Sequence, residues 1–203
     1  MEGAPTLVAA VTVVALVGLA GCAGGLGPVP GAGTAEPTAV PGTGTPHPAT
    51  APTVRATVVE VIDGDTVRVR YRNGTTETVR LLGVDAPEVR AENDPGEFEG
   101  VPDTEAGRRC LRRAGEAASA AARSRLAGET VGLGFDPEAD RRGGYGRLLA
   151  YVYVGNGTFN HRLLVAGHAR LYESPFVERS RYAAAEARAR AADRGVWACA
   201  TGD

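Results

Sequence analysis

The sequence contains no lysine, only three cysteines and no excess of positive charge. All 22 basic residues among its 203 are arginines, and none precedes Arg55. Two of the 24 acidic residues, Glu2 and Glu36, lie before that point, so residues 53–203 carry 22 acidic and 22 basic side chains. This balance excludes a generally basic surface. A chain of this composition that binds phosphate must therefore concentrate its positive charge locally.

The longest apolar run extends from Leu7 to Ala20. It is shorter than the ~20 residues that a membrane-spanning helix needs, and its length is that of a signal-peptide core. The following Leu19-Ala20-Gly21-Cys22 resembles the lipobox of prokaryotic lipoproteins, in which the cysteine is acylated and becomes the mature N-terminus. The basic residue that usually precedes the core is missing, and an uncleaved N-terminal anchor is the alternative. We expect residues 1–21 to be a lipoprotein signal peptide and Cys22 to be the lipidated residue.

Residues 22–53 are rich in glycine, proline, threonine and alanine and carry almost no charge. Such a segment cannot bury a core, which predicts a flexible, lipid-anchored linker. The folded domain is expected over residues 54–200, outside the cytoplasm and held at the outer face of the cell membrane. Cys110 and Cys199 are the remaining cysteines, and an oxidising compartment favours a disulfide between them. Two separate buried thiols are the alternative.

Five segments have the β-branched, alternating pattern of half-buried strands. In one of them Val67, Val69 and Tyr71 share one face, while arginines occupy the other. Asn73-Gly74 predicts a hairpin turn after this strand. The five predicted strands are Val54–Ile62, Thr66–Arg72, Thr76–Leu82, Thr130–Phe135 and Leu148–Val154.

Three segments have helical patterns and recognisable end signals. The predicted helices are Cys110–Leu126, which ends before Gly128; a short helix capped by Asn160 that ends at Gly167; and a helix from Ser174-Pro175 to Arg194 that ends at Gly195. The order is three strands, a helix, two strands and two helices. It predicts an α+β fold, mainly β, in which five strands form an OB-type barrel with three helices.

Three motifs carry the chemistry. They are Val-Ile-Asp-Gly-Asp-Thr-Val at residues 61–67, Val-Arg-Leu-Leu-Gly-Val-Asp-Ala-Pro-Glu at 79–88, and Gly-Tyr-Gly-Arg-Leu-Leu-Ala-Tyr-Val at 144–152. In this order and at these intervals they resemble the staphylococcal nuclease (thermonuclease) family. The resemblance covers roughly residues 54–197, which is nearly the whole expected domain.

The residue types support a metal site independently of that resemblance. Asp65 and Asp85 stand at the ends of strands separated by one hairpin, so both can meet at one edge of a barrel. Paired carboxylates suit a hard cation, and calcium tolerates their irregular geometry. Asp63 is expected to stabilise the turn through its own backbone, with an accessory role near the metal as the alternative.

The resemblance assigns roles to the remaining site residues. It implies a Ca²⁺ ion held by Asp65, Asp85 and the backbone carbonyl of Ala86, where a threonine is frequent in the family. It implies that Glu88 is the general base, although positioning of the water or the loop is a competing role. The guanidinium of Arg80 lies in an apolar strand, an expensive place for a charge without a partner.

The same resemblance implies that Arg80 and Arg147 bind the scissile phosphate, and a structural ion pair is the alternative role for Arg80. It places Tyr145 near the terminal phosphate and sugar of the substrate. Tyr172 is expected either to stack on a base or to belong to the core. The acidic loop from Val89 to Gly107 is longer than in the type member of the family and leaves the substrate range open.

The sequence therefore predicts an extracytoplasmic, calcium-dependent nuclease that hydrolyses phosphodiester bonds of DNA, with RNA left open, to 3′-phosphate products. The alternative is a non-catalytic nucleic-acid- or protein-binding module of the same fold at the cell surface. The expected partners are the nucleic-acid substrate and, through Cys22, the membrane. No protein partner is predicted, and a monomer is expected.

Overall fold

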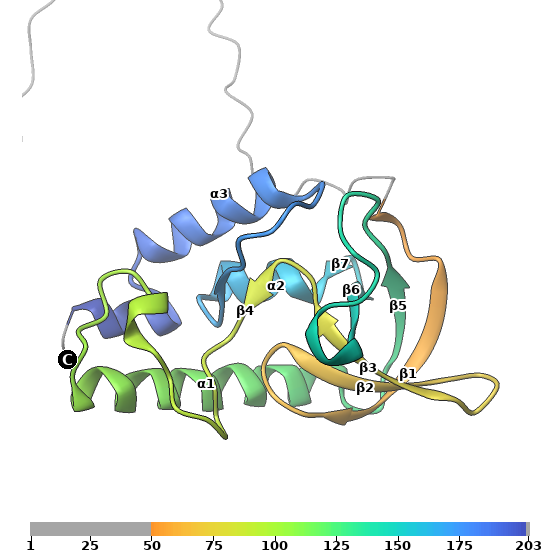
Figure 1. Cartoon of the computed structure of the whole chain (residues 1–203), viewed down its shortest axis with the longest axis horizontal. Helices are drawn as coiled ribbons and strands as arrows, with labels where there is room; N and C mark the ends of the chain where they lie inside the picture. The colour runs from red at the N-terminus through yellow and green to blue at the C-terminus, as the bar shows by residue number, and fades with distance from the viewer. Residues whose placement is uncertain (1–49, 202–203) are drawn as a thin grey trace, which may run out of the picture. The chain divides into compact units, whose positions relative to one another are not determined.

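The computed structural model describes residues 50–201 (Figure 1). The expected signal peptide, the lipidation site at Cys22 and most of the expected linker lie outside these residues. Within residues 50–201 we find no helix that combines the length and the apolar character needed to cross a membrane.

Five strands form a closed barrel, as the sequence predicted. The hydrogen-bonded order is β3-β2-β1-β5-β6, and β3 also pairs with β6, which closes the barrel. The β3–β6 pairing is parallel, and the other four are antiparallel. The barrel strands are β1 (Val54–Val61), β2 (Thr66–Tyr71), β3 (Thr76–Leu81), β5 (Thr130–Gly134) and β6 (Leu148–Val154).

Buried and exposed side chains alternate along the strands that form the barrel wall. In β2 the side chains of Val67 and Val69 are buried, whereas Arg68 and Arg70 face outward. The turn between β2 and β3 contains Gly74 at a φ of 88°, a conformation that costs glycine little. Apolar side chains from all five strands and from the helices form the main core.

Three short strands complete the sheets. β7 (Gly157–Thr158) extends the barrel sheet beside β6, while β4 (Val84–Asp85) and β8 (Arg170–Leu171) form a separate antiparallel pair. The sequence pattern did not predict these strands because two residues are too few to show alternation.

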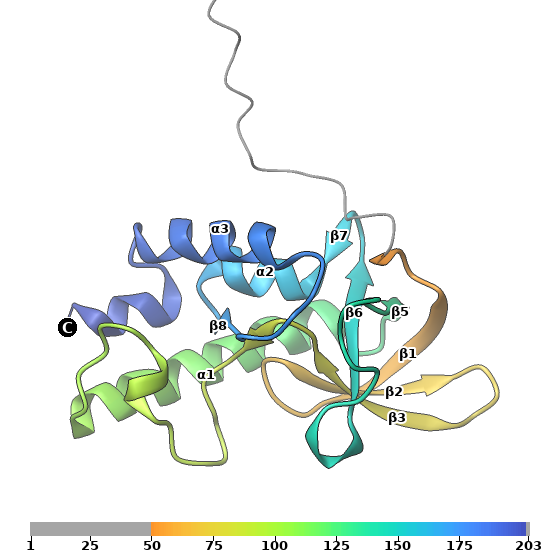
Figure 2. The same cartoon turned by 45° about the horizontal axis from the view of Figure 1, so that its top comes forward.

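The three expected helices are present, and they lie on one side of the barrel (Figures 1 and 2). Helix α1 (Glu105–Leu126) begins five residues before the predicted start at Cys110. Its N-cap is Thr104, whose hydroxyl accepts a hydrogen bond from the backbone N–H of Gly107 at 3.1 Å.

Helix α2 (Phe159–Ala166) is capped by Thr158 and not by Asn160, which corrects the prediction. Asn160 is fully buried and joins strands instead. Its side-chain oxygen accepts from the N–H of Val152 at 2.9 Å, and its amide nitrogen donates to the carbonyl of Leu82 at 3.0 Å. Gly167 ends the helix in the left-handed conformation, as expected.

Helix α3 (Arg179–Arg190) is shorter at both ends than predicted. The Ser174-Pro175 start signal is overridden because Phe176 enters the core, where its ring packs against Tyr182 with 5.3 Å between centroids. The N–H of Val177 donates to Asp136 at 3.0 Å and holds this segment extended. At the other end, the chain turns after Arg190 before the 3₁₀ helix η4 (Gly195–Ala200).

A second, smaller core lies where the start of α1 meets η4. The structure joins Cys110 and Cys199 in a disulfide with 5.7 Å between their Cα atoms. The other buried members of this cluster come from the loop after β4, from α1, from α3 and from η4: Phe98, Val101, Leu111, Ala189, Val196 and Trp197. The disulfide thus connects elements that the barrel does not hold together.

The residues just before β1 pack against the barrel. The hydroxyl of Tyr153 donates to the carbonyl of Thr50 at 2.5 Å, and the N–H of Thr53 donates to the carbonyl of Leu133 at 2.9 Å. Gly132 makes room for this segment, since a Cβ there would lie 2.6 Å from the Cβ of Pro52.

Candidate active site

The structure brings Asp65, Asp85 and Arg80 together at one end of the barrel. Asp65 precedes β2, Arg80 lies on the neighbouring strand β3, and Asp85 belongs to β4. One guanidinium group of Arg80 donates to both carboxylates, with Nη1 bonded to Asp65 and Nη2 bonded to Asp85. The side chain of Asp65 is only 1% exposed, and those of Arg80 and Asp85 are 15% exposed. Arg80 therefore pairs with two largely buried carboxylates, and its single positive charge offsets one of their two negative charges.

Local hydrogen bonds fix the orientation of Asp65. Its Oδ2 accepts from the backbone N–H of Ala86 at 2.6 Å, and its Oδ1 accepts from the hydroxyl of Thr66 at 3.0 Å. Asp63 accepts from the N–H of Asp65 at 3.1 Å, which is the turn-stabilising contact expected for it.

Arg170 is a site residue that the sequence analysis missed. Its Nη2 lies 2.6 Å from Oδ2 of Asp85 and 3.5 Å from a carboxylate oxygen of Glu97. The guanidinium also lies 5.6 Å from the ring centroid of Phe98, a member of the second core. β8 pairs Arg170 directly with Asp85 of β4.

A signal for Arg170 was present in the sequence. It stands between Ala169 and Leu171, which are both buried. Like Arg80, an arginine between apolar neighbours needs a partner for its charge, so the sequence around Arg170 indicated a buried ion pair.

Glu88 stands beside these charges on a well-held backbone. Its N–H donates to the side-chain oxygen of Asn93 at 2.7 Å, and its carbonyl accepts from the same side chain at 2.9 Å. The pKa of the Glu88 carboxyl is raised, first by partial desolvation and next by the charge of Asp63; Asp85 also raises it, while Arg80 and Arg147 lower it. These interactions place Glu88 within electrostatic reach of both arginines and both neighbouring carboxylates.

Arg147 and Arg80 line the same pocket, of about 150 Å³, together with Tyr172 and Ser174. Arg147 forms no ion pair with any residue of the part that the structure describes, and its Nε lies 3.4 Å from the carbonyl oxygen of Gly144. Two arginines therefore contribute to the wall of one pocket.

The two tyrosines predicted to bind substrate differ in position. Tyr172 is half exposed at the pocket wall. Tyr145 is fully exposed, at a φ of 60°, and its ring centroid lies 5.7 Å from the guanidinium carbon of Arg147. A tyrosine in the left-handed region is unusual and is often associated with a functional loop.

The carboxylates fit one hard cation. Asp65 and Asp85 bind opposite ends of a single guanidinium, so they already bracket one positive charge. Among residues 50–201 no cluster of three or more histidine, cysteine, aspartate or glutamate side chains has the arrangement of a metal site. The candidate donors remain Asp65, Asp85 and, as the family resemblance implies, the Ala86 carbonyl; oxygen ligands of this kind suit calcium with water completing its shell.

Comparisons with known proteins show which family the chain resembles. The chain matches the family described as Staphylococcal nuclease homologue over residues 78–199. An uncharacterized protein of Methanocaldococcus jannaschii is 39% identical over 147 residues, which cover 69% of this chain and 70% of that protein. Thermonuclease of Staphylococcus hyicus is 31% identical over 142 residues, 69% of this chain and 73% of that enzyme.

A further relative, endonuclease YncB of Bacillus subtilis, is 39% identical over 118 residues. These cover 58% of this chain, which spans about half (48%) of the length of YncB. The matched range includes Arg80, Asp85, Glu88 and Arg147, and the family expected from the three sequence motifs is confirmed. The chain belongs to the staphylococcal nuclease family.

Proposed function

We propose that this protein is a calcium-dependent nuclease that hydrolyses phosphodiester bonds of DNA to 3′-phosphate products, with RNA left open as a substrate. The observation that carries the proposal is the pocket lined by Arg80 and Arg147, with Arg80 held by Asp65 and Asp85. Two relatives support the proposal, because a thermonuclease and an endonuclease are both similar to this chain.

The arginines bind and polarise the phosphate in this proposal. Two guanidinium groups facing one pocket donate several hydrogen bonds to non-bridging oxygens. They stabilise the negative charge that grows on these oxygens as an in-line displacement proceeds. Calcium, held by Asp65, Asp85 and the Ala86 carbonyl when bound, would supply further charge neutralisation at the phosphate.

Glu88 takes the proton of the attacking water. Its raised pKa makes it a stronger base than an ordinary glutamate, and its backbone is fixed by Asn93. Tyr172 at the pocket wall and the exposed Tyr145 are available for contacts with the base, the sugar or a terminal phosphate.

We also propose that the protein acts outside the cytoplasm, as a lipoprotein anchored through Cys22. This proposal is supported by the apolar run at residues 7–20 and the lipobox-like sequence that ends at Cys22. The Cys110–Cys199 disulfide is of the kind that persists in oxidising compartments.

The test is DNA cleavage by the full chain with calcium and with chelator. Glu88→Ala and Arg147→Ala are each expected to lower kcat by on the order of 10² or more. Glu92→Ala and Arg113→Ala, which alter exposed side chains outside the pocket, serve as matched controls and should retain activity. DNA binding without any calcium-dependent cleavage would replace the enzyme with the non-catalytic binding module.

Arg170 provides a separate prediction for the metal site. Arg170→Met removes the donor that holds Oδ2 of Asp85, which leaves this carboxylate held by Arg80 at Oδ1 alone and less firmly oriented towards the cation. We expect a ~10- to 100-fold loss of calcium affinity, the usual cost of removing an outer partner of a metal ligand. The measurement is calorimetric calcium titration, together with the calcium dependence of cleavage.

Arg179→Met is the matched control for that experiment, because Arg179 pairs with Glu173 in an exposed position. Equal calcium affinities for Arg170→Met and Arg179→Met would show that Arg170 does not position Asp85.

A further inference from the structure

Unpaired arginines gather on the outer face of β1 and β2 and at the first residue after β2. Arg55, Arg70 and Arg72 are exposed, and none forms an ion pair or side-chain hydrogen bond with another residue in the described range 50–201. The sequences of β1, β2 and β5 contain one acidic residue, Glu60, and its carboxylate is already bound to Arg68. These three arginines, called the arginine patch below, therefore carry uncompensated positive charge although the domain is neutral.

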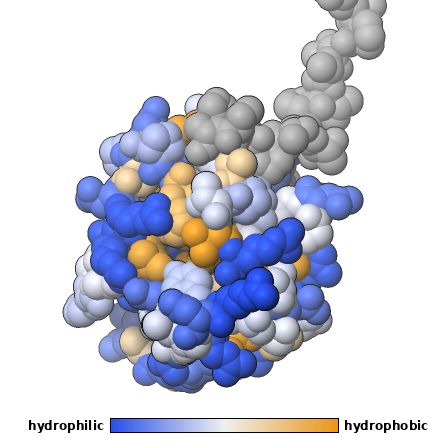
Figure 3. All heavy atoms as spheres, turned by 90° about the vertical axis from the view of Figure 1, so that its right-hand side faces the viewer, coloured by the Kyte–Doolittle hydropathy of each residue, from blue (hydrophilic) through white to orange (hydrophobic). Residues whose placement is uncertain are grey.

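The patch surrounds a groove. A hollow of about 400 Å³ is lined by all three arginines, Tyr71 and Thr57. Strongly hydrophilic side chains surround a smaller apolar area on the side of the barrel that carries the tip of the β2–β3 hairpin (Figure 3).

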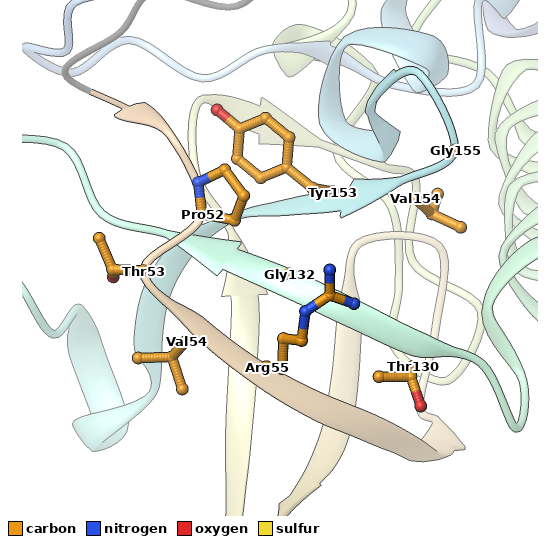
Figure 4. A pocket seen from close by; sticks show the side chains of 9 residues that line it. All are labelled: Pro52, Thr53, Val54, Arg55, Thr130, Gly132, Tyr153, Val154 and Gly155. Atoms are coloured by element: carbon orange, nitrogen blue, oxygen red, sulfur yellow. The ribbon is translucent and has the colours of Figure 1, made fainter.

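Small neighbours leave the guanidinium groups uncovered. Arg70 stands opposite Thr57, and Arg55 stands opposite Gly132 of β5. The side chain of Arg55 extends from β1 across β5 near Gly132 (Figure 4). Arg55 lines this second hollow as well as the first, so the patch is continuous along the sheet.

The patch also connects with the loop that leads to the active site. Tyr71 lies in the groove, and Arg141 and Arg142 are near enough to its hydroxyl to lower its pKa against the larger, raising effects of burial and Glu77. Arg142 donates to the carbonyl of Gly146 at 2.6 Å, one residue before Arg147 of the catalytic pocket.

We propose that the arginine patch is a second binding surface for the phosphate backbone of the nucleic-acid substrate, outside the catalytic pocket. The inference rests on the proposed nuclease function and extends the nucleic-acid binding site beyond the catalytic pocket. Arg70 and Arg72 follow Asp65 by five and seven residues, which is about 17 and 24 Å along a strand. A duplex covers that distance in about five to seven base pairs at ~3.4 Å each.

The chemistry selects a polyanion with regularly spaced phosphates. Guanidinium groups bind phosphate oxygens in a bidentate manner and need no particular base, so the patch adds affinity without sequence preference. It also explains how a domain without net positive charge can hold a long nucleic acid.

The test compares DNA binding by the full chain and by the triple variant Arg55→Gln/Arg70→Gln/Arg72→Gln. Binding of a 30-base-pair labelled duplex is measured by fluorescence anisotropy in chelator at several salt concentrations. We expect the dissociation constant to rise about tenfold or more, and the slope of log affinity against log salt to fall by about two to three, near 0.9 for each lost phosphate contact.

The matched control is Arg113→Gln/Arg123→Gln/Arg188→Gln, which removes three exposed arginines from α1 and α3. Thermal unfolding of both variants shows whether they are folded. In calcium, the patch variant should show a raised KM on long DNA and an unchanged kcat on a p-nitrophenyl ester of thymidine phosphate. A loss of affinity equal to that of the control, or no loss, would overturn the proposal.

Two further outcomes separate this proposal from its basis and from a membrane role. Patch-dependent DNA binding without calcium-dependent cleavage would refute the nuclease function and support the patch. Loss of binding to phosphatidylglycerol vesicles with unchanged DNA binding would refute the patch as a nucleic-acid surface, because it would assign these arginines to lipid headgroups.

Discussion

Replacing Arg80 with methionine is expected to lower kcat/KM on DNA by on the order of 10³ and to destabilise the protein most strongly when calcium is absent. The guanidinium lies between Asp65 and Asp85, and Asp65 is almost wholly buried. Removing one partner of a buried ion pair leaves an uncompensated charge, which typically costs about 3 to 5 kcal/mol. Arg80 thus has a structural role in addition to its proposed contact with phosphate.

Calcium should reverse most of the loss of stability. A cation bound between the same carboxylates replaces the missing positive charge, so calcium should raise the free energy of unfolding of Arg80→Met more than that of the wild type. Urea unfolding in chelator and in calcium measures this difference. Activity is not expected to recover, because the phosphate still lacks its donor.

Arg68→Met is the matched control for Arg80→Met. Arg68 lies on the adjacent strand and also forms an ion pair, but Arg68 and its partner Glu60 are both exposed. Such pairs contribute up to about 1 kcal/mol. If both variants lose the same stability in chelator, the buried pairing of Arg80 is not what holds the two carboxylates.

The barrel and the first set of site residues were predictable from local patterns. Valines and arginines alternate along β2, and the motifs place Asp65, Arg80 and Asp85 one hairpin apart. Because adjacent strands fix which ends meet, the proximity of these residues follows from the order of the strands. Asp65 lies before residue 78, where the family match begins, and its prediction depends on its own motif and on its place at a strand end one hairpin from Asp85.

The features that the sequence did not predict depend on contacts between residues far apart in the chain. The start of α3 was placed too early because the Ser174-Pro175 signal is local, whereas the hydrogen bond from Val177 to Asp136, which holds this segment extended, is not. The role of Arg170 required the pairing of β4 with β8, strands of two residues without a periodic pattern.

The pairing state of each arginine is also a tertiary property. Arg68 and Arg70 occupy the same face of the same strand, yet the first is bound to Glu60 and the second is unpaired in the described part of the chain. The equal totals of acidic and basic residues do not show which arginines are paired and which are unpaired. A sequence can therefore exclude a generally basic surface while leaving room for a local one.

Removing the disulfide is expected to have the largest effect on stability. Cys110 and Cys199 are separated by 89 residues, and a cross-link of that span contributes about 4 to 5 kcal/mol in the chain-entropy model. Cys110→Ser/Cys199→Ser should therefore lower the free energy of unfolding by about that amount, measured by urea unfolding. Dithiothreitol should have the same effect on the wild type and none on the double variant.

We expect removal of the disulfide also to affect the active site, through Phe98. This residue belongs to the disulfide-linked core, and the guanidinium of Arg170 lies over its ring while holding Asp85. We expect the double variant, assayed at a temperature where it is folded, to require more calcium for half-maximal cleavage. Cys22→Ser, which leaves the bridge intact, controls for loss of a cysteine. An unchanged calcium requirement in the folded double variant would show that the second core stabilises the fold without positioning the metal site.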